Sequence, residues 1–469
     1  MQRLFGMPGG GANADLIEAA GCAGLPFSLA HTETGSAFMA TAQAEITGKP
    51  GVCIATLGPG AASVMNGIAN AYLDRVPLIV LTDCARQGAF HQAIPQSAMF
   101  SPLVKWTASL DTAGALLKAI DIALEPPQGP VHLDCGAGNP ACSRLSGGPL
   151  AQPKKASVGP PNPRHPVALI GLNARRRAPE IRSICERSAI PALVTYKAKG
   201  VIPDHHPWFA GVLTNGSLER ELLERADVFL NFGLDEVELV RPWDYPQPMI
   251  DGWQPEINRT DWDPADIHRI AEEQRSRMRV GATSRLAPYR VAELAAEVYS
   301  GARTTVDAGA HMFPVMALWP VNNPFQLLIS NGLSTMGFAL PAAIGAALLD
   351  PSQSVVVFTG DGGLMMCLGE LKTAARESLR LRIIVFDDGE LSLIKVKQVQ
   401  RGYRTDGISI GEVNWPQLGA GLGVLARAAH DEDSLRRCLC ETRDHPGPVL
   451  IAAKIDPDTY RETIRALRG

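Results

Sequence analysis

The sequence predicts an α/β protein made of three consecutive, doubly wound parallel-sheet domains. Three segments, at residues 1–150, 165–285 and 289–469, alternate short β-branched apolar runs with longer helix-compatible stretches, which is the pattern of βαβ units. Residues 147–164 are rich in proline and glycine, so they predict a linker between the first two segments. A chain of 469 residues is long enough for several domains that each bury a core.

The composition excludes several classes of protein. A hydrophobic content of 46% and a charged content of 20% are typical of a globular protein, and a formal charge of -4 gives no electrostatic reason to expect nucleic acid or an anionic membrane as partner. No apolar run reaches the roughly 18 residues of a membrane span. The nine cysteines are scattered and include no CxxC pair, which predicts no zinc site and a reducing, cytoplasmic location.

The first segment has the order strand, glycine-rich turn, helix, strand. Apolar runs predict three strands, at residues 51–57, 77–82 and 129–135. The turn Gly58-Pro59-Gly60 follows the first of these strands, and the small residues at 61–72 predict a helix. Because sequential strands joined by helices lie parallel, we expect one parallel sheet here.

The middle and third segments repeat this alternation. Apolar runs predict middle-segment strands near residues 166, 191 and 227, and third-segment strands near residues 304, 325, 354, 382 and 448. Residues 337–349 and 414–421 predict helices, whereas residues 242–287 have weak periodicity and are interpreted as the end of the middle domain plus a connection. The first and third segments share a plan without a close sequence repeat, so we expect them to be similar in architecture only.

Two acidic turns in the third segment predict a metal and phosphate site. Asp361 follows one apolar run and Asp388 follows the next, 27 positions later, so both should lie at the carboxyl edge of one parallel sheet. Glycines at 360, 362 and 363 allow backbone N–H groups to approach an anion. Two carboxylates beside such a turn suit Mg²⁺ that also binds phosphate oxygens. The alternative is that both segments are ordinary polar turns, in which glycine and aspartate are common.

The same stretch resembles the diphosphate-binding signature of thiamine diphosphate-dependent enzymes. The sequence GDGG, the 27-position spacing and the later LSLIKVKQ are similar to the acetolactate synthase and 2-oxoacid decarboxylase group. The resemblance implies that Asp361, Asp388 and the backbone carbonyl of Glu390 bind Mg²⁺, and that Gly360, Gly362 and Gly363 bind the diphosphate of thiamine diphosphate. That family usually has Asn-Asn or Asn-Asp where this chain has Asp387-Asp388, so the role of Asp387 is open.

Other segments carry the resemblance across nearly the whole chain. Glu33, in the sequence HTETGSAF, occupies the position of the family's catalytic glutamate, which bonds to the aminopyrimidine ring of the cofactor and should lie in apolar surroundings. Without the family, a helix N-terminal carboxylate would explain Glu33 equally simply. Met336 occupies the position of the apolar wedge under the bent cofactor, and Ser334 that of a carbonyl acceptor; alone, such a methionine is more often core packing.

Three further positions match the family's first domain. Gly58 and Gly60 match the turn that binds the pyrimidine ring. Gln92 matches a glutamine of the acetolactate synthases, whereas the neighbouring His91 departs from their pattern. His91 is therefore either a second catalytic polar group beside Gln92 or a surface histidine.

The resemblance assigns names to the domains and a reaction to the protein. It implies a pyrimidine-binding domain that looks short at its N-terminus, a middle domain and a diphosphate- and Mg²⁺-binding domain. The implied activity is decarboxylation of a pyruvate-like 2-oxo acid with carboligation to a second carbonyl. The active site would form between subunits of a homodimer or homotetramer. FAD is not indicated, because the middle segment lacks a glycine-rich nucleotide turn.

Four alternatives to this function stay open. Two are enzymes that use the same cofactor: a simple 2-oxo acid decarboxylase and a benzaldehyde lyase-type C–C lyase. A third is a catalytically weak thiamine diphosphate-binding protein, although such a protein would not need Glu33. A fourth, a phosphotransferase, would require a lysine in the GDGG loop, which has none.

Overall fold

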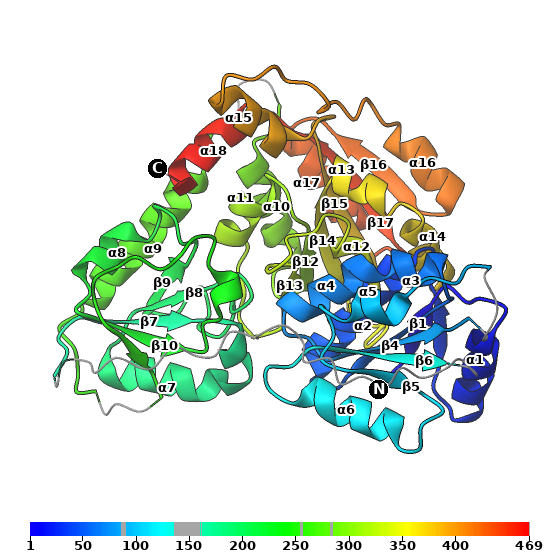
Figure 1. The fold of residues 1–469 in the computed structure, drawn as a ribbon. Helices are drawn as coiled ribbons and strands as arrows, with labels where there is room; N and C mark the ends of the chain where they lie inside the picture. Colours follow the sequence, from blue (N-terminus) through cyan, green and yellow to red (C-terminus); the bar gives the residue numbers. More distant parts are fainter. Residues whose placement is uncertain (86–90, 136–159, 161, 254–256, 282–284, 469) are drawn as a thin grey trace.

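The computed structural model describes residues 1–469 except 86–90, 136–159, 161, 254–256, 282–284 and 469. Three sheets follow one another along the chain, and every strand pairing in the described residues is parallel. Figure 1 shows the first and third sheets stacked on one side and the middle sheet beside them. The predicted α/β class with three parallel-sheet domains is confirmed, whereas most of the predicted linker lies outside the described residues.

The first sheet has the strand order β2-β1-β3-β4-β6-β5. Its strands are β1 (Leu4–Gly6), β2 (Phe27–Leu29), β3 (Gly51–Ala55), β4 (Leu78–Asp83), β5 (Thr107–Ser109) and β6 (Pro130–Cys135). The helices of this part are α1 (Ala12–Cys22), α2 (Glu33–Thr47), α3 (Pro59–Ser63), α4 (Met65–Leu73), α5 (Gln96–Phe100) and α6 (Ala115–Leu124). The single helix predicted at 61–72 is thus two helices, which meet at Val64.

The middle sheet has the order β11-β10-β7-β8-β9. Its strands are β7 (Pro166–Ile170), β8 (Ala192–Val194), β9 (Phe209–Val212), β10 (Val228–Phe232) and β11 (Met249–Asp251). Two 3₁₀ helices, η1 (Leu172–Arg177) and η2 (Glu236–Glu238), accompany α7 (Ala178–Ser188), α8 (Arg220–Arg225) and α9 (Pro264–Met278). Helix α9 lies where no helix was predicted; Asp263 caps it through the Ala265 N–H, and its Ile267 and Ile270 join the middle core.

The third sheet, β13-β12-β14-β15-β17-β16, has the same topology as the first, because each strand takes the corresponding place in the order. Its strands are β12 (Arg303–Val306), β13 (Leu327–Ile329), β14 (Val355–Gly360), β15 (Leu381–Asp387), β16 (Leu425–Ala429) and β17 (Val449–Lys454). Its helices are α10 (Pro288–Tyr299), α11 (Met312–Leu318), α12 (Ala339–Ala347), α13 (Asp361–Met366), α14 (Glu370–Arg376), α15 (Ser392–Gln400), α16 (Trp415–Leu422), α17 (Glu432–Thr442) and α18 (Thr459–Arg468). The expected similarity of architecture is therefore present. None of the described helices is long and apolar enough to cross a membrane.

Both faces of the first and third sheets are buried, and alternate residues of each strand serve different cores. In β14, Val355 and Val357 face one core, whereas Val356 and Phe358 face another. The first of these cores also contains the inward residues of the first sheet, so it is continuous between the two domains. Strands buried on both faces explain why the sequence has continuous apolar runs rather than alternation.

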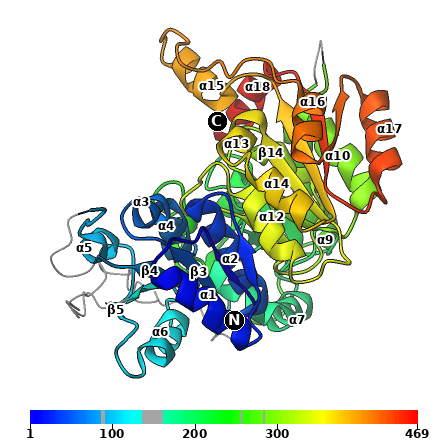
Figure 2. The ribbon, with the colours of Figure 1, turned by 90° about the vertical axis from the view of Figure 1, so that its right-hand side faces the viewer.

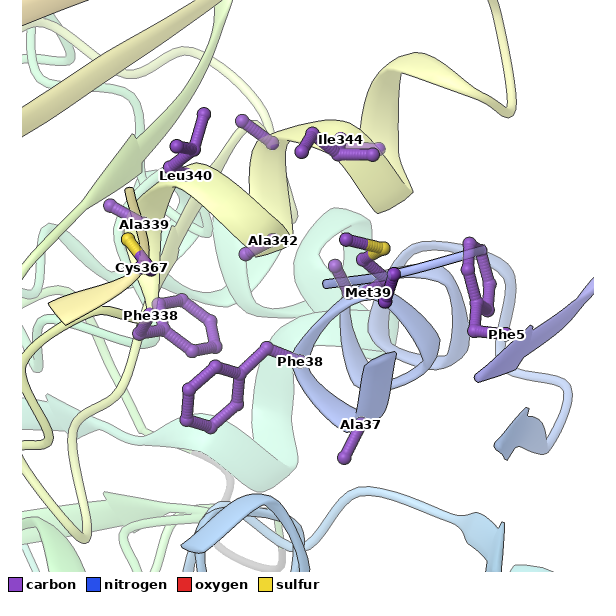
Figure 3. Packing of buried hydrophobic residues seen from close by; sticks show 14 of the residues in the cluster. Phe5, Ala37, Phe38, Met39, Phe338, Ala339, Leu340, Ala342, Ile344 and Cys367 are labelled. Atoms are coloured by element: carbon purple, nitrogen blue, oxygen red, sulfur yellow. The ribbon is translucent and has the colours of Figure 1, made fainter. Parts of the chain in front are cut away.

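Helices α2 and α12 form the contact between the first and third sheets (Figure 2). A Cβ atom at Gly345 would lie 2.3 Å from the carbonyl oxygen of Met39, so the helix backbones approach too closely for any side chain there. Gln43 Nε2 donates to the Gly345 carbonyl at 2.9 Å. Phe38 and Phe338 meet edge to face at 5.4 Å near the first turns of the two helices (Figure 3).

We predict that Gly345→Ala destabilises the protein by about 1–3 kcal/mol, because the added methyl group overpacks the α2–α12 contact. The control is Gly421→Ala on α16, where an added Cβ atom would meet no heavy atom within 4 Å. That substitution should be neutral or stabilising by up to about 1 kcal/mol, as expected for alanine in a helix. Urea unfolding of both variants measures the difference; equal stabilities would contradict the close contact.

Candidate active site

The two predicted acidic residues lie together at one edge of the third sheet. Strand β14 ends at Gly360 and pairs in parallel with β15, with Gly360 opposite Phe386, so Asp361 and Asp388 follow neighbouring strands. The Gly389 N–H donates to Asp361 Oδ2 at 2.7 Å, and the Gly362 N–H donates to Asp361 Oδ1 at 2.7 Å. Asp388 accepts from the Glu390 N–H at 3.1 Å and from the Ser392 hydroxyl at 2.6 Å.

The surroundings of these carboxylates raise the free energy of their charged forms. Burial raises the pKa of Asp361 to about 6, and the nearby Asp387 charge adds to this effect. Burial, followed by repulsion from Asp361, raises the pKa of Asp388 to about 7. A bound divalent cation would relieve both effects, and hard carboxylate oxygens are the ligands that Mg²⁺ prefers.

The described residues contain no group of three or more histidine, cysteine, aspartate or glutamate side chains placed to bind a metal together. The carboxylate of Glu390 pairs with Lys395 Nζ at 2.7 Å, so its predicted contribution would come from the backbone carbonyl. Asp361, Asp388 and that carbonyl leave about half of an octahedral shell for phosphate oxygens and water. This donor set fits a metal that binds a diphosphate.

The contacts of Asp387 explain how the chain accommodates a third carboxylate. Asp387 is fully buried at the end of β15, opposite Lys454 at the end of β17. Its Oδ2 atom lies 2.8 Å from Lys454 Nζ and accepts from Trp415 Nε1 at 2.8 Å. The negative charge of Asp387 is therefore balanced by a cation on the neighbouring strand.

His311 is a candidate residue that sequence reasoning missed. It lies in the turn between β12 and α11, and its ring stacks on Phe386 at 5.1 Å. Burial lowers the pKa of His311 to about 3, so the ring is neutral. Its Nε2 atom is buried and has no hydrogen-bond partner among the described residues, while a Cβ atom at Gly360 would lie 3.4 Å from Nδ1. The one sequence signal for His311 is its position, as a polar residue a few positions after the strand predicted near residue 304.

Asp307 is a second missed residue, and it shapes the turn that contains Met336. Its carboxylate accepts from the N–H groups of Gly337 and Phe338 at 3.0 and 2.9 Å and from the Thr359 hydroxyl at 3.0 Å. Burial raises the pKa of Asp307 to about 6. A Cβ atom at Gly363 would lie 2.1 Å from Asp307 Oδ2, which explains the need for glycine there.

The structure places Met336 beside the glycine turn and Ser334 on the surface. The Met336 methyl group lies 3.4 Å from the position that a Cβ atom at Gly362 would occupy. Ser334 is exposed and has a φ of 51°, a left-handed conformation that is unusual for a residue other than glycine. Gly337 follows with a φ of 78°.

The remaining predicted residues form a second group, in the first domain. Glu33 begins α2, and a Cβ atom at Gly60 would lie 3.1 Å from its Oε1 atom. A Cβ atom at Gly58 would lie 2.5 Å from the carbonyl oxygen of Gln92, so the glycine turn packs on this residue. The side chains of His91 and Gln92 are exposed.

These two groups are not joined within one chain. Among the described residues, no hydrogen bond or ion pair connects Glu33 with Asp361 or Asp388. The two residues that precede Glu33 instead contact α14: the N–H groups of His31 and Thr32 both donate to Glu370 Oε1, at 2.9 and 3.1 Å. We call the residues around Glu33 and those around Asp361 and Asp388 the two candidate half-sites.

Comparison with known families identifies the class of protein. Residues 1–102 match the family described as the N-terminal TPP binding domain of thiamine pyrophosphate enzymes, residues 162–274 match the central domain, and residues 307–453 match the C-terminal TPP binding domain. The three matches occur in the predicted order. The chain belongs to the thiamine pyrophosphate enzymes, and the predicted thiamine diphosphate dependence is confirmed.

Relatives narrow this class to proteins like acetolactate synthase. The chain is 27% identical to acetolactate synthase isozyme 1 large subunit of Escherichia coli (strain K12), with 92% of this chain and 87% of the relative covered. It is 26% identical to acetolactate synthase of Bacillus subtilis (strain 168), covering 97% and 90% of the two chains. It is 27% identical to the catabolic acetolactate synthase of Raoultella terrigena, covering 98% and 93%. The chain is thus an acetolactate synthase-like enzyme that uses thiamine diphosphate in decarboxylation or carboligation.

We predict that Asp387→Ala destabilises the protein by about 3 kcal/mol, because Lys454 and the Trp415 indole lose a buried acceptor. Asp387→Asn keeps an oxygen for Trp415 and should cost less. Thermal unfolding measures both changes. The ion pair has no structural role if both variants are as stable as the unaltered chain.

Proposed function

We propose that this enzyme uses Mg²⁺ and thiamine diphosphate to decarboxylate a pyruvate-like 2-oxo acid and to join the resulting two-carbon unit to a second carbonyl. The observation that carries this proposal is the pair of repelling carboxylates, the buried Asp361 and the half-buried Asp388, beside a glycine turn and Met336. The acetolactate synthase relatives support the choice of reaction over simple decarboxylation or C–C bond cleavage.

In this proposal the third domain binds the diphosphate end of the cofactor. Asp361, Asp388 and the backbone carbonyl of Glu390 hold Mg²⁺, and Gly360, Gly362 and Gly363 leave room for phosphate oxygens. The buried Nε2 atom of His311 has no hydrogen-bond partner among the described residues, and this supports a further role of its ring as a polar contact for the bound cofactor. Thiamine diphosphate supplies the electron sink that allows a 2-oxo acid to lose CO₂.

The first domain and the segment before α12 bind and orient the other end of the cofactor. Glu33 holds and moves a proton at the aminopyrimidine ring, while Gly58 and Gly60 let the backbone approach that ring. Met336 would be the apolar side chain that supports the rings of the cofactor, and the Ser334 carbonyl would be the acceptor for its amino group. Gln92 and His91, both exposed in one chain, are then available to contact the substrate.

The proposal requires a homodimer as the minimum active unit, or a homotetramer built from it. No hydrogen bond or ion pair joins Glu33 to Asp361 or Asp388 among the described residues, and in this proposal Glu33 of one copy faces Asp361 and Asp388 of another. Large apolar side chains near the carboxylates support such an interface, because they are exposed on α13 and α15: Met365, Met366, Ile394 and Val399. A second copy that covers these helices would complete the site.

We predict that Glu33→Gln lowers kcat by about 10²–10⁴-fold and leaves thiamine diphosphate binding nearly unchanged, because glutamine keeps the shape of the side chain but cannot transfer a proton. The assay supplies pyruvate, Mg²⁺ and thiamine diphosphate and follows CO₂ and acetolactate separately. Full activity of Glu33→Gln would exclude the assignment of Glu33. In the unaltered enzyme, release of CO₂ without acetolactate would indicate a decarboxylase. If neither CO₂ nor acetolactate formed, the assignment of a pyruvate-like substrate would be wrong.

We predict that Asp361→Ala and Asp388→Ala weaken Mg²⁺-dependent binding of thiamine diphosphate by about 100-fold, because each removes a metal ligand. Isothermal titration across a range of Mg²⁺ concentrations measures the loss. Asp387→Asn is the control and should have a much smaller effect, since its carboxylate contacts Lys454 and Trp415. An equal effect of all three substitutions would contradict the assignment of the ligands.

A further inference from the structure

A buried lysine, Lys197, connects all three domains. It lies in the turn after β8 of the middle domain, and its side chain is 1% exposed. Its Nζ atom contacts Glu45 Oε1 at 2.7 Å and Asp74 Oδ2 at 3.1 Å, both in the first domain. The same atom donates to the carbonyl oxygen of Ile329, the last residue of β13, at 3.0 Å. Its ammonium group thus uses three acceptors from the two other domains.

The negative charge of Asp74 depends on Lys197 for balance more than the negative charge of Glu45 does. Glu45 also pairs with Arg175 at 2.6 Å, and these two cations outweigh the effect of burial, so that the pKa of Glu45 is lowered. Asp74 has Lys197 as its one cationic partner among the described residues; burial dominates and its pKa is raised. Loss of Lys197 would leave Asp74 as a buried carboxylate without a balancing charge.

Asp74 in turn holds the segment that leads to Met336. The Gly332 N–H donates to Asp74 Oδ1 at 2.8 Å. A Cβ atom at Gly332 would lie 2.7 Å from Leu73 and 2.9 Å from Val237, so the segment is confined between the first and middle domains. Further along, Asn66 Nδ2 of α4 donates to the Thr335 hydroxyl at 3.1 Å.

This segment contains a backbone conformation that needs support. Ser334 and Gly337 both have positive φ angles, on either side of Met336. A non-glycine residue in the left-handed region costs free energy and persists only where its surroundings hold it. The contacts at Ile329 and Gly332 lie immediately before this turn and restrict the path by which the backbone enters it.

We propose that Lys197 is a positioning residue of the middle domain: through Ile329 and Asp74 it fixes residues 329–337, and with them Met336 and the Ser334 carbonyl, in the geometry that binds the cofactor. This inference rests on the proposed function only for the role of Met336 and Ser334. It gives the middle domain a direct effect on cofactor binding, although Lys197 lies in neither half-site.

The chain contains a matched control in Lys199. Its Nζ atom, equally buried, pairs with Asp204 Oδ2 at 2.7 Å and donates to the carbonyl oxygen of Met316 in α11 at 2.9 Å. Lys199 thus also joins the middle and third domains through a backbone carbonyl, while its buried ion pair lies within the middle domain. None of its contacts reaches residues 329–337. Lys199→Met should therefore reproduce the loss of stability without the loss of positioning.

The first test measures hydrogen–deuterium exchange of the full chain without cofactor. In Lys197→Met, peptides that cover residues 329–337 should exchange faster than in the unaltered chain, whereas in Lys199→Met they should not. Unchanged exchange in Lys197→Met, or equally faster exchange in both variants, would overturn the proposal. Because no cofactor is used, this result is informative even if the unaltered chain fails to bind thiamine diphosphate, which would reject the proposed function instead.

The second test measures binding of thiamine diphosphate at saturating Mg²⁺, together with the melting temperature. We expect the Kd to rise by about tenfold in Lys197→Met, as is typical when support for a binding residue is lost, and to stay close to the unaltered value in Lys199→Met at a similar melting temperature. If Lys197→Met does not fold, Asp74→Ala, which removes the acceptor of Gly332, should show the same tenfold rise. An unchanged Kd in the folded variant would overturn the proposal.

Discussion

Two neighbouring carboxylates that repel each other, the buried Asp361 and the half-buried Asp388, define the third domain of this enzyme. Parallel pairing of β14 and β15 brings them to one edge, and backbone N–H groups and the Ser392 hydroxyl stabilise them only in part. A third carboxylate, Asp387, is tolerated because Lys454 and Trp415 bind it. The arrangement has an excess of negative charge that a bound divalent cation would balance.

The packing between domains determines which residues surround this edge of the third sheet. The first and third sheets share a core through α2 and α12, whose backbones come into contact at Gly345. This contact sets how the first domain packs against the third. The middle domain contributes through Lys197, which binds both neighbours at the start of the segment that carries Met336.

Much of the fold was predictable because long buried strands are continuous apolar runs, such as residues 355–358 and 383–386. The sequence analysis missed six strands, β1, β2, β5, β9, β11 and β16. Four of them, β1, β2, β5 and β11, have three residues each and are too short to show a period. It also missed α9, although Asp263 and Pro264 are a recognisable helix start, because the surrounding tryptophans, prolines and charges obscured the periodicity. The break between helices α3 and α4 at Val64 had no signal in the local sequence.

The sequence by itself determined the class of chemistry, because the GDGG turn, the later aspartates and Glu33 are local patterns that need no partner to be recognised. Tertiary structure alone decided which polar residues share a site. His311 and Asp307 come to the glycine turn because β12 lies beside β14, and Asp387 has a partner because β17 lies beside β15. Strand order in a parallel sheet is set by long-range packing, so contacts between residues far apart in the chain cannot be read from local sequence.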